Sequence, residues 1–426
     1  MEVKSVSKCD ETFTKKNKIR CPIAKARIRR CRARGGSGGV PAKAARGRPS
    51  PMSMASVART PSPPFARHRR WSSRVSKSGC SSRPRASAAD LADLAPPADP
   101  CAFVLEAVAR ATATDHFVIS AERVLALAAQ RGLDPQDLLP EFVREAQKLA
   151  IPPTSKFHVG AAALGASGAV YLGVNVELPG LPLNASIHAE QFAVVTAMRA
   201  GERALEAIAT TAAPCGHCRQ FMNELRGAAS MRVIIPDPGD AATNARKRHL
   251  VLPLCDLLPH SFGPLDLTRD ESLPLMLEER HNGLRFAPGS IIPGGSGAAT
   301  DGELDAAAAE LALTEANAAY APYSASPAGL ALVDDVGAMH AGRSVESAAY
   351  NPTMSPLHAA LMAAVGSAGM GDANGGEWGR IESATLVEMS GAPVQYAGTV
   401  ALILKTIAPR ARLNVIACEK AEPGAS

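Results

Sequence analysis

The sequence predicts an α/β fold that occurs twice along the chain. Two strand-like stretches, 159–164 and 170–176, are separated by a turn rich in Gly and Ser, and segments with helical spacing of apolar residues flank them. Residues 303–420 repeat the order of these elements in a weaker form. Helices that alternate with strands in this way cover a sheet. We therefore expect two related α/β lobes.

The first hundred residues differ in composition from the rest. Residues 1–100 carry 23 Lys and Arg against 6 Asp and Glu, whereas residues 101–426 carry 23 against 34. Abundant Ser, Pro and Gly without apolar periodicity predict a disordered basic leader. From Met54 to Ala88 the chain is rich in Ser and Arg and lacks acidic residues, which is typical of an organelle transit peptide. Residues 1–53 would then lie upstream of the start codon and would not normally be translated. The alternative is a basic tail without a targeting role.

The remaining chain is acidic, which argues against a broad phosphate-binding face and against a nucleic-acid partner. An odd count of 9 Cys without a spaced framework does not indicate a secreted disulfide scaffold. No apolar run reaches the roughly 18 to 20 residues that a membrane span needs. We expect a soluble protein in a reducing compartment.

The expected elements follow in a regular order. Helices at 117–128 and 137–146 precede the hairpin. A helix at 188–200 begins with His-Ala-Glu, and a helix at 215–225 follows Pro214, which is well tolerated at a helix start. The His-Ala-Glu segment and the segment that begins at Cys215 therefore both lie at helix N-termini, where the helix dipole stabilises thiolates.

The Gly- and Pro-rich segment 288–297 looks like a linker. This suggests a catalytic domain at 115–275, a linker at 276–300 and a second domain at 301–420.

The second domain can be laid over the first, with Ser344-Val345-Glu346 on Asn175-Val176-Glu177 and His358 on His188. In this alignment the second copy has Ala360 in place of a carboxylate and Ala397 in place of a cysteine. We expect the second copy to be degenerate.

His188, Cys215 and Cys218 offer one imidazole and two thiols, and Glu190 adds a carboxylate. Such a set can hold Zn²⁺ with one open coordination position and move protons beside it. His217 lies between the two cysteines, and we expect its ring to point away from the metal. The sequence predicts one zinc site in a hydrolytic metalloenzyme.

Residues 115–420 resemble the cytidine deaminases of the homodimeric, two-lobed type. The run Ala213–Leu225, the His-Ala-Glu segment and Gly173–Glu177 carry the resemblance. It implies a three-layer α/β/α fold, duplicated as a catalytic lobe and a degenerate second lobe. It also implies that Zn²⁺ is held by His188, Cys215 and Cys218 and that Glu190 is the catalytic acid and base.

The resemblance further implies the substrate contacts. Asn175 and Glu177 would bind the ribose hydroxyls, Phe157 would stack on the base, and the amide of Ala189 would contact the base or the incoming oxygen. The implied reaction is hydrolytic deamination of cytidine and 2′-deoxycytidine to uridine and 2′-deoxyuridine with release of ammonia, in pyrimidine salvage. The implied assembly is a homodimer in which Ser347–Pro352 completes the partner's site. The implied compartment is the cytosol, or a plastid or mitochondrion if the leader is a transit peptide.

Three alternatives stay open. A deaminase acting on cytosine within RNA or DNA would need a basic track, which the body of the chain lacks. Cys-Gly-His-Cys is also an active-site sequence of thiol-disulfide oxidoreductases, although Pro214 and the upstream His-Ala-Glu do not fit that class. A decayed, non-catalytic relative is disfavoured by the complete residue set of the first lobe.

Overall fold

The computed structural model describes residues 100–113, 117–237, 248–290, 299–366 and 377–421. All of them belong to one compact unit, residues 84–426. The predicted leader, including Met54, lies outside the described residues except for Pro100. Among the helices of the described ranges, none has the length and apolar character needed to cross a membrane.

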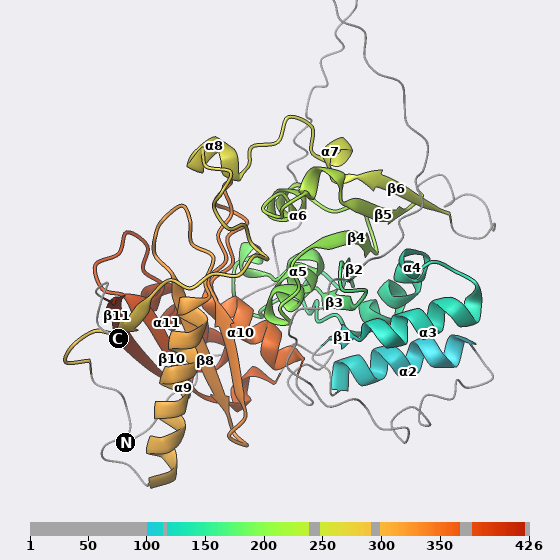
Figure 1. The fold of residues 1–426 in the computed structure, drawn as a ribbon. Helices are drawn as coiled ribbons and strands as arrows, with labels where there is room; N and C mark the ends of the chain where they lie inside the picture. Colours follow the sequence, from blue (N-terminus) through green and yellow to red (C-terminus); the bar gives the residue numbers. More distant parts are fainter. Residues whose placement is uncertain (1–99, 114–116, 238–247, 291–298, 367–376, 422–426) are drawn as a thin grey trace, which may run out of the picture. The chain divides into compact units, whose positions relative to one another are not determined.

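The first lobe contains a six-stranded sheet in the order β1-β3-β2-β4-β5-β6 (Figure 1). Only β4 and β5 run parallel; the other neighbours are antiparallel. The strands are β1 (Val118–Ile119), β2 (Gly160–Gly165), β3 (Val170–Val174), β4 (Leu205–Thr210), β5 (Arg232–Pro236) and β6 (His249–Pro253). The α-helices up to the end of this region are α2 (Pro100–Ala113), α3 (Ala121–Arg131), α4 (Pro135–Ala146), α5 (Ala189–Arg199), α6 (Gly216–Met222), α7 (Leu254–Leu257) and α8 (Pro264–Thr268).

The helix predicted at 117–128 begins later than expected. Phe117 has a positive φ of 67°, and residues 118–119 form β1, which pairs with β3. Ser120 is the extended N-cap of α3. Apolar spacing alone included the strand in the helix, because a two-residue strand carries no periodicity of its own.

Two glycines show that helices cover both faces of the first sheet. A Cβ on Gly160 would lie 2.6 Å from the Val143 oxygen in α4, and a Cβ on Gly173 would lie 2.1 Å from the Ala189 oxygen in α5. Gly173 pairs with Ala161, the neighbour of Gly160, so the two glycines face opposite sides of the sheet. The first lobe is therefore a three-layer α/β/α sandwich.

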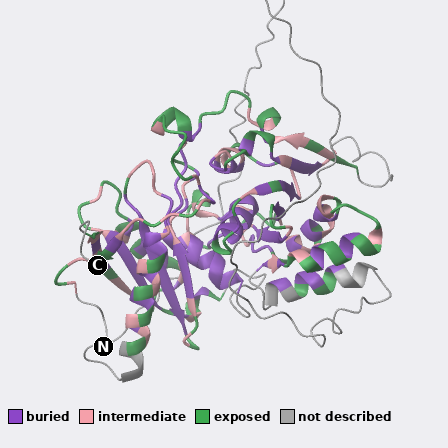
Figure 2. Cartoon of the chain, viewed as in Figure 1, coloured by how far each residue is buried: buried purple, intermediate pink, exposed green. Residues whose placement is uncertain are grey.

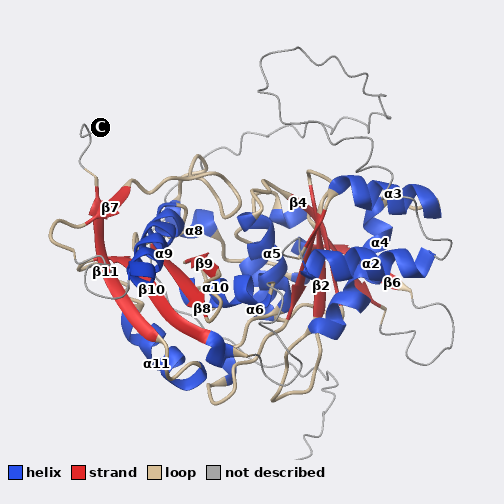
Figure 3. Ribbon diagram, turned by 90° about the horizontal axis from the view of Figure 1, so that it is seen from below, coloured by secondary structure: helices blue, strands red, loops and turns tan. Residues whose placement is uncertain are grey.

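The second lobe contains a five-stranded sheet in the order β7-β11-β10-β8-β9 (Figure 3). Its only parallel pair is β10 with β11. The strands are β7 (Leu284–Phe286), β8 (Ala328–Asp334), β9 (Met339–Arg343), β10 (Ile381–Met389) and β11 (Arg412–Lys420), and the α-helices are α9 (Ala299–Asn317), α10 (Pro356–Val365) and α11 (Ala397–Ile407).

The second lobe repeats the glycine arrangement of the first. A Cβ on Gly329 would meet the Ala312 oxygen in α9 at 2.1 Å, and one on Gly342 would meet the Ala360 nitrogen in α10 at 2.2 Å. Gly342 pairs with Leu330, so these glycines also face opposite sides. The predicted α/β/α fold, built twice, is confirmed. Buried residues make up much of both sheets and nearly all of α5 and α10 (Figure 2).

The segment 276–300, where the sequence predicts a linker, takes part in the packing. Met276 is fully buried, and β7 pairs with β11 of the second sheet. Residues 291–298 lie outside the described ranges. The described part of the segment thus begins in a core cluster to which both lobes contribute and then becomes an edge strand of the second sheet.

The structural alignment of the two lobes differs from the sequence alignment at His358. Val176 bridges to Ile187, directly before His188, and Val345 bridges to Met354, directly before Ser355. His188 is the N-cap of α5, and Ser355 is the N-cap of α10. The structural counterpart of His188 is therefore Ser355, and laying His358 over His188 was wrong by three positions along the helix. The second lobe has a shorter connection before its helix, which residue identity alone did not indicate.

Candidate metal centre

The three sulfur and nitrogen ligands predicted from the sequence come from the N-termini of two adjacent helices. His188 is the N-cap of α5, and Cys215 is the N-cap of α6 after Pro214. Cys218 lies in the first turn of α6 and is fully buried. The helix predicted at 215–225 is shorter than expected, because α6 ends at Met222.

The distances between the ligand atoms fit a tetrahedral zinc ion. Sγ of Cys215 lies 3.7 Å from Sγ of Cys218 and 3.6 Å from Nδ1 of His188, and Sγ of Cys218 lies 3.3 Å from the same nitrogen. Tetrahedral zinc with its usual bond lengths would separate two sulfurs by about 3.8 Å and a sulfur from a nitrogen by about 3.6 Å. Hydrogen bonds with Cys218 and His188 lower the pKa of Cys215 to about 3, so a thiolate is favoured there. The hydrogen bond with Cys215, together with burial, raises the pKa of Cys218. The spacing of the ligand atoms suits Zn²⁺.

Glu190 lies beside this group on α5. Its carboxylate oxygen Oε2 is 3.2 Å from Sγ of Cys218, and the residue is only 5% exposed. Burial raises the pKa of Glu190, opposed in part by hydrogen bonds and by the charge of His188. A carboxyl group in this position can both accept and donate a proton.

His217 packs on the ligand set without joining it. Its ring stacks on that of His188, with centroids 4.8 Å apart and an interplanar angle of 18°. Among the described residues, the only His, Cys and acidic side chains whose ligand atoms gather closely enough for a metal are His188, Cys215 and Cys218.

These groups open onto a cavity of about 380 Å³. Ala189 and Glu190 lie in its wall, and Phe157 lies there with 58% of its surface exposed. The cavity brings together all of the predicted site residues except Cys218, which lies behind the wall. Its lining residues are Ser155, Phe157, Val159, Asn175, Glu177, Leu183, Ser186, Ile187, His188, Ala189, Glu190, Ala212, Ala213 and Cys215.

Asn175 and Glu177 lie just after β3 rather than within it, on either side of the bridged Val176. Asn175 accepts a hydrogen bond from the Val159 amide at 2.8 Å and donates one to the Phe157 carbonyl at 2.9 Å. The Asn175 side chain therefore also holds the chain around Phe157.

Glu177 is 6% exposed and accepts hydrogen bonds from the amides of Thr154 at 2.8 Å and Ser155 at 2.9 Å, both at Oε2. Burial would raise the pKa of Glu177, but the hydrogen bonds from Ser155 and Thr154 outweigh it and lower the pKa. The group is therefore a carboxylate at neutral pH.

The sequence analysis did not single out Arg219, which holds the cysteine segment in place. Its Nε donates to the Pro214 carbonyl and its guanidinium also donates to the Leu257 carbonyl, both at 2.7 Å. An arginine directly after the second cysteine was the available signal, but its partners are backbone atoms that no sequence pattern marks.

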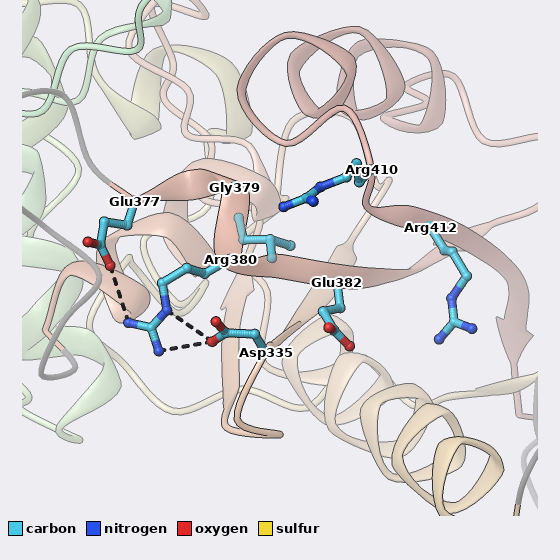
Figure 4. Close-up of a pocket in the computed structure, with 8 residues that line it drawn as sticks. Asp335, Glu377, Gly379, Arg380, Glu382, Arg410 and Arg412 are labelled. Carbon is cyan, nitrogen blue, oxygen red and sulfur yellow. Dashed lines mark hydrogen bonds and ion pairs between the residues drawn. The ribbon is translucent and has the colours of Figure 1, made fainter.

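A larger cavity, of about 640 Å³, lies in the second lobe and has a different character (Figure 4). Arg380 pairs there with Asp335 at 2.9 Å and with Glu377 at 3.6 Å. Its lining holds none of the predicted site residues and neither histidine nor cysteine. The smaller cavity is therefore the candidate site.

Comparisons with known proteins agree with this assignment. Residues 135–234 match a family model described as the cytidine and deoxycytidylate deaminase zinc-binding region, and residues 254–401 match a second model with the same description. The chain is 43% identical over 307 residues to a protein named cytidine deaminase 1 of Arabidopsis thaliana, covering 72% of this chain and 98% of the relative. It is 35% identical over 302 residues to a protein named cytidine deaminase of Serratia proteamaculans, covering 71% of this chain and 87% of the relative.

Among solved structures, a crystal structure of a cytidine deaminase from Burkholderia pseudomallei is 34% identical and covers 30% of this chain and 98% of that chain, with a TM-score of 0.26. The long relatives match both lobes and nearly their whole own length. The chain belongs to the cytidine and deoxycytidylate deaminase family.

Proposed function

We propose that the chain catalyses the zinc-dependent hydrolytic deamination of cytidine and 2′-deoxycytidine, giving uridine or 2′-deoxyuridine and ammonia. One observation carries the proposal: the ligand group of His188, Cys215 and Cys218 meets the buried Glu190 at the wall of a cavity of about 380 Å³. A cavity of this size suits a small molecule. The names of the relatives, all cytidine deaminases, support this substrate class.

In this proposal His188, Cys215 and Cys218 hold Zn²⁺. When bound, the ion would lower the pKa of a water molecule and so supply a nucleophile near neutral pH. Glu190 takes up the two protons of the attacking water in turn and passes one to the ring nitrogen and the other to the leaving amine of the cytosine. Its burial and raised pKa support this role, because the proton can be both held and released.

The substrate contacts are assigned from the cavity wall. Glu177 and Asn175 bind the ribose hydroxyls, and Phe157 offers an exposed ring face for stacking on the base. Ala189, the first residue of α5, contributes its backbone amide. A polymer substrate is disfavoured by the acidic body of the chain. Thiol-disulfide exchange is disfavoured because both sulfurs converge on the His188 nitrogen.

The direct test follows the ultraviolet absorbance of cytidine and 2′-deoxycytidine with the wild type and with Glu190→Ala, together with the zinc content of each. We expect about one zinc per chain in both proteins and turnover only in the wild type. A zinc-loaded Glu190→Ala variant that keeps its rate would contradict the role of Glu190. A wild type free of zinc, or inactive with zinc, would contradict the proposed function.

We also propose a homodimer in which Ser347–Pro352 completes the partner's site, and a place in pyrimidine salvage. We propose a catalytic domain at 115–275, a connecting segment at 276–300 that packs as described above, and a second domain at 301–420. The proposed compartment is the cytosol, with a plastid or mitochondrion if Met54 begins a transit peptide. Light scattering on the purified chain and localisation of a fluorescent fusion of residues 54–100 would test these points.

A further inference from the structure

Glu224 is a buried carboxylate that joins the two lobes. It lies just after α6, the helix that carries Cys218, and it is fully buried. Its side chain accepts hydrogen bonds from the hydroxyls of Tyr320 at 3.0 Å and Tyr323 at 2.5 Å, and from the amide of Ala348 at 2.6 Å. All three donors belong to the second lobe. The helix with the two cysteines is thus anchored outside its own lobe.

This anchor has an energetic consequence. A buried carboxylate is strongly destabilising unless several donors compensate it. Burial raises the pKa of Glu224, and the hydrogen bonds from Tyr323, Ala348 and Tyr320 oppose that rise. The carboxylate is therefore stable only while the second lobe is in place, so the position of Glu224 depends on that lobe.

A second contact joins α5, the helix that carries Glu190, to the same part of the second lobe. Gln191 follows Glu190 on α5, is 2% exposed, and donates from Nε2 to the Pro352 carbonyl at 2.9 Å. Ala348 and Pro352 belong to the stretch that the sequence assigned to the partner's site, and here they contact the chain's own first lobe.

The corrected register shows that the lobes exchange equivalent contacts. Because Ser355 corresponds to His188, His358 corresponds to Gln191. His358 contacts the Ala185 carbonyl of the first lobe through Nε2 at 3.0 Å, as Gln191 contacts the Pro352 carbonyl. The histidine that looked like a relic of a metal site thus occupies the interface position of Gln191.

We propose that Glu224 and Gln191 are positioning residues through which the second lobe holds the two helices that carry the metal ligands and Glu190. Zinc ligation requires a fixed relative position of α5 and α6, because His188 and the cysteines come from different helices. At 7 residues, α6 is too short to be rigid by itself. Arg219 holds the segment before it, and Glu224 holds its other end. The degenerate lobe thereby acts on the metal centre without touching it.

This inference rests on the proposed zinc site, and the test compares zinc retention with folding stability in the full chain. The variants are Tyr323→Phe, Tyr320→Phe, their double variant and Glu224→Gln. A chromogenic chelator measures the rate of zinc release, and urea unfolding measures global stability. Loss of residues that orient metal ligands typically weakens metal binding 10- to 100-fold. Because Glu224 acts through α6, we expect release about tenfold faster in the double variant.

Tyr171→Phe is the matched control. The Tyr171 hydroxyl also donates to a buried carboxylate at 3.0 Å, that of Glu202, but at the β2–β3 turn of the first lobe. We expect this variant to lose about as much stability as either single variant, Tyr320→Phe or Tyr323→Phe, and to release zinc within twofold of the wild type. Equal release rates in Tyr171→Phe and the double variant would overturn the inference.

The Co²⁺-substituted protein gives a readout independent of turnover. We expect the thiolate-to-metal absorption band to change in the double variant and to stay unchanged in Tyr171→Phe. If the Glu224→Gln variant fails to fold, the tyrosine variants still decide the question, because they keep the carboxylate and remove single donors. A wild type that binds no zinc would contradict the proposed function instead, so the two failures are distinguishable.

Discussion

Glu177 offers the sharpest separation of substrate binding from folding. Its Oε2 holds the amides of Thr154 and Ser155, and the residue lines the candidate cavity. In the second lobe, Glu346 holds the amides of Tyr323 at 2.9 Å and Ser324 at 3.1 Å in the same way. The two carboxylates thus have equivalent backbone partners, but only Glu177 borders the cavity. The variants Glu177→Gln and Glu346→Gln should therefore share one effect and differ in another.

The shared effect is on the free energy of unfolding. A hydrogen bond to a charged group contributes about 1.5 to 3 kcal/mol, against about 0.5 to 1.5 for a neutral pair. Replacing the carboxylate with an amide weakens two such bonds in each lobe. We expect a loss of about 2 kcal/mol from either variant, measured by urea unfolding.

The different effect is on the kinetics. Losing a charged acceptor for a ribose hydroxyl should lower kcat/KM for cytidine about 5- to 30-fold, mainly through a higher KM, because the bond forms in the ground state as well. Glu346→Gln should leave KM within twofold of the wild type. An equal rise of KM in both variants would refute the reasoning, because the effect would then be a general loosening of the fold. An unchanged KM in Glu177→Gln would refute the ribose contact itself.

Four further outcomes are expected. Glu190→Gln should keep its zinc, measured by elemental analysis, and lose about 10²- to 10⁴-fold in kcat, the usual contribution of a positioned acid and base. Removing the metal with a chelator should abolish deamination, and added Zn²⁺ should restore it. Cys215→Ser should bind zinc weakly both before chelation and after Zn²⁺ is added. Gly173→Ala should destabilise the protein by about 3 kcal/mol in thermal or urea unfolding, because its Cβ would lie 2.1 Å from the Ala189 oxygen, while Gly379→Ala, with open space around it, should change stability by less than about 0.5 kcal/mol. The pKa of Glu177 is lowered in the folded state. The stability that its hydrogen bonds provide should therefore be complete above the pKa of an unfolded Glu and be lost as the pH falls through the lowered value. In Glu177→Gln, the loss of unfolding free energy at acid pH should be smaller than in the wild type.

The candidate metal centre could be predicted because its parts are local. His188 and Glu190 lie in one helical turn, and Cys215 and Cys218 lie in another. The helix start at Pro214 placed the two cysteines, and the resemblance to the family joined them to His188 and Glu190. The chemistry of the ligand types then pointed to zinc without any knowledge of distances.

The second lobe was harder to predict in detail, although its presence as a copy was expected. Its glycines Gly329 and Gly342 repeat the packing roles of Gly160 and Gly173, which preserves the fold after the reactive residues are gone. The alignment of its helix nevertheless failed, because the shorter connection between Val345 and Met354 is visible only through the bridge that joins them. The histidine present in both copies was a stronger signal in the sequence than a connection that is two residues shorter, and it was misleading.

The contacts between the lobes could not have been found from sequence, because each joins a side chain to groups far away along the chain. Glu224 lies within the most recognisable run of the protein, yet its polar partners are two tyrosine hydroxyls and a backbone amide of the other lobe. A carboxylate just after a short helix would ordinarily be expected at the surface. Because Glu224 is completely buried, the first lobe alone would leave this carboxylate either exposed or without its donors, next to the helix that carries Cys218. A chain truncated near residue 290 should therefore be poorly active or insoluble even before any contribution to a partner's site is considered, and a soluble truncated form with normal zinc retention would show that the first lobe can do without this anchor.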